Sequence, residues 1–180
     1  KVNLLLELAY DLKNNNPERA IELCKEGLAL AKNENFSNGI AQGHFVMAQI
    51  EYKTGAYQNA LDNYSESLKI LIQLSSLQPK NEENKLSLAR CYSGIGNIHY
   101  FKGDYEKALS FYIKSLKIYE ATGNKFGIAA ASMGLGNIYM AQNNLDMALD
   151  YYFKSLSIRR VVDRQDPKDM KNKQAMGGVY

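Results

Sequence analysis

Residues 94–98 read GIGNI, and residues 134–138 read GLGNI forty positions later. The match extends outward on both sides, over CYSGIGNIHYFKGDY at 91–105 and SMGLGNIYMAQNNL at 132–145. The stretch HFVMAQIEYKTGAY at 44–57 follows the same order of small, apolar and polar positions. Similarity at a fixed period within one chain is the signature of a repeat architecture, so these stretches decide the fold.

A second block of repeated positions follows each of these stretches. Every copy has an alanine, an apolar residue directly after it and a leucine eight positions after it. The alanines are Ala20, Ala60, Ala108 and Ala148, and the leucines are Leu28, Leu68, Leu116 and Leu156. The alanines are 40, 48 and 40 positions apart. This spacing predicts units at residues 1–40, 41–88, 89–128 and 129–169, with a partial fifth unit at 170–180.

Both halves of each unit have a helical period. Leu61, Tyr64, Leu68 and Leu71 recur at the spacing of one face of an amphipathic helix. Short breaks separate the halves, at residues 14–17, 54–56, 102–104 and 142–144. Glycine or asparagine at the second position of each break suits a left-handed residue that closes the first helix. Each unit is therefore predicted to be two antiparallel helices joined by a tight turn.

These columns resemble the tetratricopeptide repeat, which has Leu-Gly, Gly, Tyr, Ala and an aromatic residue in fixed order. The third unit supplies Ile95-Gly96, Gly103, Tyr105, Ala108 and Tyr112 at these places. The resemblance implies an all-α, right-handed superhelix of antiparallel helix pairs, forming a single domain over residues 1–180. The first unit departs most from the pattern.

The period of 40 residues exceeds the usual 34. It resembles the long-repeat subclass found in spindle-orientation scaffolds, bacterial peptide-sensing regulators and the sensory halves of bacterial histidine kinases, and the connectors favour the bacterial signalling group. The eight additional residues of the second unit predict a helix that continues to about Leu77. Pro79 would end this path, and Asn81 followed by Glu82 and Glu83 would begin the next helix.

Composition and motifs argue against several functional classes. A net charge of +3 without a polybasic run does not favour nucleic acid as a partner. No apolar run is long enough for a membrane span, so we expect no direct membrane contact. Cys24 and Cys91 are expected to be core residues, as are His44 and His99. No nucleophile, metal or nucleotide motif is present, so we expect neither an enzyme nor a cofactor.

The resemblance also implies a concave groove lined by the first helix of each unit. Asn97 and Asn137 occupy a groove-facing column that holds Gln49 in the second unit, and an amide can both donate to and accept from a ligand. The alternative is that these amides are only solvated polar residues. The expected groove residues are Gln42, Phe45, Gln49, Tyr52, Lys53, Arg90, Ser93, Asn97, Tyr100, Phe101, Met133, Asn137 and Met140.

We therefore expect a protein- or peptide-binding module of a larger signalling or regulatory protein, which binds a helical or extended segment in its groove. The alternative is a structural scaffold domain that self-associates into a homo-oligomer. A cytoplasmic location is favoured, unless the module is the extracytoplasmic sensor half of a membrane kinase.

Overall fold

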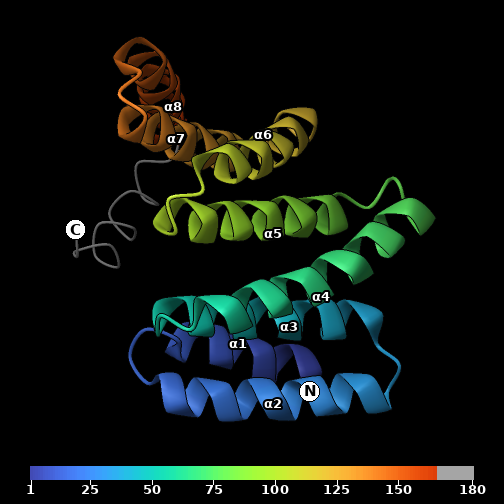
Figure 1. The fold of residues 1–180 in the computed structure, drawn as a ribbon. Coiled ribbons are helices and arrows are strands. Elements are labelled where there is room, and N and C mark those ends of the chain that lie inside the picture. Colours follow the sequence, from blue (N-terminus) through green and yellow to red (C-terminus); the bar gives the residue numbers. More distant parts are fainter. Residues whose placement is uncertain (166–180) are drawn as a thin grey trace.

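The structure of the protein is a computed structural model that describes residues 1–165. Eight α-helices and no strand occur in this range, and they follow one another as antiparallel hairpins (Figure 1). The helices are α1 (Val2–Leu12), α2 (Pro17–Asn33), α3 (Ser37–Lys53), α4 (Tyr57–Leu77), α5 (Glu82–Phe101), α6 (Tyr105–Ala121), α7 (Lys125–Ala141) and α8 (Leu145–Gln165). The predicted all-α architecture is confirmed. The expected partial unit at 170–180 lies outside the described residues.

The hairpins stack in chain order. Every helix packs against the next one, and the first helices of adjacent hairpins also contact one another, as α1 with α3, α3 with α5 and α5 with α7. The odd-numbered helices therefore form one continuous layer, whereas each even-numbered helix packs only on the helices before and after it in the chain. The hairpin of α7 and α8 turns away from the lower stack in Figure 1, as expected for a superhelical solenoid. No described helix is long and apolar enough to cross a bilayer.

Three of the four turns within hairpins close with a left-handed residue, as predicted. Gly55, Gly103 and Asn143 have φ of 81°, 78° and 58°. The prediction is wrong for Asn15, which does not have a positive φ. Here α1 ends at Leu12, and the carbonyl of Leu12 accepts from the backbone N–H groups of both Asn15 and Asn16. This longer turn reverses the chain without a left-handed residue.

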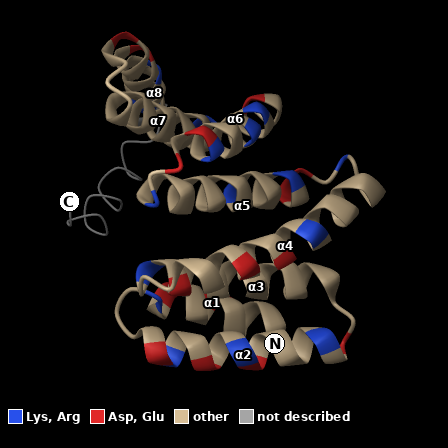
Figure 2. Cartoon of the chain, in the orientation of Figure 1, with Lys and Arg blue, Asp and Glu red and all other residues tan. Residues whose placement is uncertain are grey.

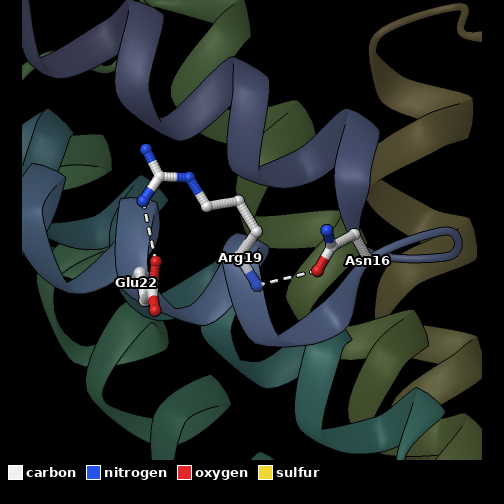
Figure 3. Close-up of polar contacts among 3 residues, drawn as sticks. All are labelled: Asn16, Arg19 and Glu22. Atoms are coloured by element: carbon white, nitrogen blue, oxygen red, sulfur yellow. Dashed lines mark hydrogen bonds and ion pairs between the residues drawn. The ribbon is translucent and has the colours of Figure 1, made fainter.

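The second helix begins with a side-chain cap. Asn16 Oδ1 accepts a hydrogen bond of 3.1 Å from the backbone N–H of Arg19, and Pro17 occupies the first helical position (Figure 3). This geometry satisfies a donor that the helix cannot pair internally. The Arg19 side chain in turn lies 2.7 Å from Glu22 at the surface.

The additional residues of the second unit extend α4 to Leu77, as predicted. Asn81 then caps α5, because its side chain accepts from the backbone N–H of Asn84 at 3.1 Å, and Glu82 and Glu83 occupy the first turn. The first helices start at Ser37, Glu82 and Lys125, ahead of the repeat columns at residues 41, 89 and 129.

Small residues allow the close approach of the helices. Ala20, Ala60, Ala108 and Ala148 are fully buried. Three adjoining hydrophobic clusters form the core, and each is built from residues of neighbouring hairpins. The helices that line the groove described below are therefore held in place by packing against their neighbours in these clusters.

Candidate functional site

A cavity of about 890 Å³ opens on the layer of odd-numbered helices. Its lining comes mainly from α1, α3 and α5, with a floor from α4 and one residue each from α6 (Tyr119) and α7 (Ala130). Eight of the expected groove residues line it, namely Gln42, Phe45, Gln49, Tyr52, Lys53, Arg90, Ser93 and Asn97. The expected columns of the second and third units therefore converge on this cavity.

Five expected residues lie outside this cavity. They are Tyr100, Phe101, Met133, Asn137 and Met140. Tyr100 is half-buried against Phe101 and Tyr105, whereas Phe101, Met133 and Met140 are exposed. The hairpin of α7 and α8 rises away from the stack, so the same columns face a more open surface there.

The sequence reasoning missed the contribution of α1. Glu7, Tyr10, Asp11 and Lys13 line the cavity, together with Asn38, Glu83, Asn84 and Ser87. One signal was available, because Lys13 occupies the same repeat column as the expected Lys53. This correspondence was overlooked because the first unit matches the family pattern poorly.

Two amides of the groove-facing column are hydrogen-bonded to tyrosines of their own hairpins. The Tyr112 hydroxyl donates to Asn97 Oδ1, and the Tyr152 hydroxyl donates to Asn137 Oδ1 at 2.8 Å. Burial raises the pKa of Tyr112, so this hydroxyl stays protonated as a donor. With its oxygen engaged, each amide keeps its N–H₂ group for another partner.

The second unit has the corresponding pair, Gln49 and Tyr64. Burial raises the pKa of Tyr64, and hydrogen bonding with Gln49 opposes the rise. Gln49 Oε1 itself is buried and lies outside hydrogen-bond range of any described donor. The first unit lacks both members, since Ala9 and Cys24 stand in their places.

Tyr64 and Tyr112 each fit a notch in the next unit. A Cβ atom added at Gly94 would lie 2.4 Å from Tyr64 Cζ, and one added at Gly134 would lie 2.3 Å from Tyr112 Cε1. Where the preceding unit carries the smaller Cys24, the second unit has Val46 instead of glycine. Tyrosine, amide and glycine therefore occur together along the chain as one packing unit.

Aromatic rings gather where α3 and α5 end. The rings of Tyr52 and Tyr57 lie 5.9 Å apart, and Phe101 lies 5.9 Å from Tyr52 and is stacked on Tyr57 at 6.5 Å. Tyr100 meets Phe101 edge to face at 5.6 Å. Since Tyr52 also lines the cavity, this cluster continues the groove onto the surface.

The histidines and cysteines lie in structural networks. His44 Nδ1 lies 2.7 Å from Asn63 Oδ1, and Asn63 Nδ2 donates to Glu51 at 2.8 Å. Cys91 Sγ lies 3.3 Å from the Ser67 hydroxyl in the core. Over residues 1–165, no group of three or more His, Cys, Asp or Glu side chains is placed to hold a metal ion.

Residues 87–160 match the sequence model of the family described as tetratricopeptide repeat. No curated protein matches the chain by sequence. Among solved structures, BtubC (BKLC) from P. vanneervenii superposes with a TM-score of 0.72 at 17% identity, covering 91% of this chain and 66% of that one. The structure of MamA superposes at 0.62 with 20% identity over 91% of this chain and 81% of that one. At these identities the neighbours share the fold.

Proposed function

We propose that this tetratricopeptide-repeat chain, a protein-interaction or scaffold module, binds a helical or extended segment of another protein in its concave groove. The proposal extends to a role within a larger signalling or regulatory protein. Affinity would come from apolar and aromatic anchors such as Phe45 and Tyr52, and orientation from the amides above the groove floor.

The orientation of the amides is the observation that carries this proposal. Tyr112 and Tyr152 engage the Oδ1 atoms of Asn97 and Asn137, which leaves donors at equivalent places in successive units. An extended segment offers backbone carbonyls at regular intervals, and a helix offers carbonyls at its carboxyl end. A repeated donor therefore suits either kind of main-chain ligand.

Affinity capture from native lysate tests the proposal. The bait is the chain itself, compared with the double variant Asn97→Ala/Asn137→Ala, and circular dichroism verifies that both fold equally. The matched control is Asn59→Ala/Gln73→Ala, which removes two exposed amides of α4 that do not line the cavity. A partner held by wild type and by the control, but lost by the groove variant, supports binding through the amides.

A partner retained equally by all three baits would contradict the proposal and move the site to the outer helices or the loops. Tyr112→Phe gives a finer test, because it removes the hydroxyl that orients Asn97 and keeps the ring. Weaker capture by this variant would show that the tyrosine positions the amide for its ligand.

Self-association is the second candidate function. The outer face of α8 exposes Leu145, Leu149, Phe153 and Leu156, and α1 exposes Leu4 and Leu8 at the opposite end of the stack. Apolar faces at both ends could stack copies head to tail. Analytical ultracentrifugation decides this, because concentration-dependent association that Leu149→Lys abolishes would support a scaffold, and a monomer at all concentrations would refute it.

A further inference from the structure

Building on groove binding, we propose that the groove end formed by α1, α3 and α5 selects an acidic segment. In this segment a carboxylate stands next to an aromatic or large apolar side chain. The carboxylate would lie between Lys13 and Lys53, and the apolar side chain would pack on the rings of Phe101, Tyr52 and Tyr57.

The aromatic part of this site is exposed but held in place. Phe101 is 60% exposed, yet its ring is stacked on Tyr57 with an interplanar angle of 9° and contacts Tyr52 at 5.9 Å. The three rings come from α5, α4 and α3, so they join two hairpins. A fixed aromatic surface binds an apolar side chain at low entropic cost, which is the property of an interface anchor.

The basic part adjoins the rings. Lys13 and Lys53 line the same cavity as Tyr52. Lys13 Nζ lies 3.2 Å from the centre of the Tyr10 ring and donates to the Tyr10 carbonyl at 3.0 Å, which fixes the ammonium group. Neither lysine lies within ion-pair distance of a carboxylate in the part of the chain that the structure describes.

The two ammonium groups also act on one another. Burial lowers the pKa of Lys13, nearby Asp11 opposes this shift, and the positive charge of Lys53 adds to it. A carboxylate placed between the two lysines would relieve their repulsion and form charge-assisted hydrogen bonds. Figure 2 shows blue segments near the left-hand ends of α3 and α5, where these helices terminate.

The other charges of the groove favour a peptide over a nucleic acid. Glu7, Asp11 and Glu83 line the same cavity, so a continuous row of phosphates would meet repulsion along it. A single carboxylate brings one negative charge to the two lysines instead of a row of charges along the groove. The repeat column that holds Lys13 and Lys53 in the first two units holds Phe101 in the third. Along this column, two positive charges are therefore followed by an aromatic ring.

The test uses the acetylated, amidated dipeptides Phe-Glu and Phe-Gln as probes in NMR titrations of the chain carrying ¹³C-labelled lysine and phenylalanine. Phe-Glu should shift the Cε signals of Lys13 and Lys53 and the ring signals of Phe101. Phe-Gln should bind about 1.5- to 5-fold more weakly, the range expected for one exposed ion pair. At about 1 M salt, where the Debye length is about 3 Å, this difference should vanish.

Variants assign the effect to the two lysines. Lys13→Met and Lys53→Met should each weaken Phe-Glu binding by about 1.5- to 5-fold and leave Phe-Gln binding unchanged. Lys117→Met, at an exposed position on α6 outside the cavity, is the matched control.

Equal affinities for the two dipeptides at the groove would overturn the acidic preference and leave groove binding intact. The absence of shifts with either dipeptide at millimolar concentration would also overturn the preference. Shifts confined to labelled side chains on the outer faces of α2, α4 or α6 would contradict the preference and groove binding together. Tighter binding of an eight-nucleotide oligothymidylate through Lys13 and Lys53 would replace the peptide with a nucleic acid.

Discussion

At the residue scale, Tyr112 shows how one side chain joins adjacent units. A Cβ atom at Gly96 of its own hairpin would lie 2.9 Å from the Tyr112 ring, and one at Gly134 of the next hairpin 2.3 Å from it. Its hydroxyl reaches Asn97. The sequence predicted a core tyrosine and a groove amide at these columns. It could not predict the bond between them, because that depends on the direction of the ring across two helices.

Gly134→Ala should destabilise the chain by about 1–3 kcal/mol, because the new methyl group overpacks the Tyr112 ring. This loss should exceed the gain of about 1 kcal/mol in helix propensity. Urea unfolding followed by circular dichroism measures the difference. In a Tyr112→Leu background the same substitution should cost less. A Gly134→Ala chain more stable than wild type would show that the notch is not filled.

The buried thiols predict a loss of stability in alkali. Burial raises the pKa of Cys24 and of Cys91 from 9.0 to about 12, so folding favours the protonated thiols. This contribution is complete below the pKa of the unfolded thiols and disappears as pH rises from about 9 to about 12. Urea unfolding at about pH 8 and about pH 11 should show the loss. The Cys24→Ala/Cys91→Ala variant should lose less over this range, the remainder coming from buried tyrosines, and an unchanged slope would contradict this assignment.

At the element scale, the connection between α4 and α5 was predictable because its signals are local. Pro79 cannot continue the helix, and Asn81 with two acids begins the next one. The turn between α1 and α2 was not predictable, because Asn15 has the residue type of a left-handed cap. The helix end at Leu12 and the Asn16 cap decide its conformation instead.

Asn81→Ala should destabilise the chain by about 1 kcal/mol, since the backbone N–H of the buried Asn84 loses its acceptor. Thermal unfolding measures the effect. Asn59→Ala, at an exposed position within α4, is the control and should cost nothing. Equal stabilities of the two variants would mean that the cap does not stabilise α5.

At the scale of the whole molecule, each hairpin contacts only its neighbours in the stack. The repeat columns predicted the superhelix and the side of it that carries the groove. They could not predict that the cavity would be limited almost entirely to the first three units. Ala130 is its only lining residue from α7. That outcome depends on accumulated rotations between hairpins, which the sequence does not display locally.

This arrangement predicts graded protection along the chain. The inner helices α5 and α6 are packed on both sides, whereas α8 exposes Leu145, Leu149 and Phe153 on its outer face. Hydrogen exchange followed by mass spectrometry should show slower exchange in α5 and α6 than in α1 and α8. Uniform protection would indicate that the four hairpins open as a single unit.

The most direct test of the central claim maps the binding surface. Peptides selected on the chain from a random displayed library would be titrated into the ¹⁵N-labelled protein, with backbone shifts recorded by NMR. Groove binding predicts shifts along α3 and α5, including Gln49 and Asn97, and little change on the outer faces of α2, α4 and α6. Shifts confined to those outer faces, or a selection that yields no binding peptide, would contradict the account.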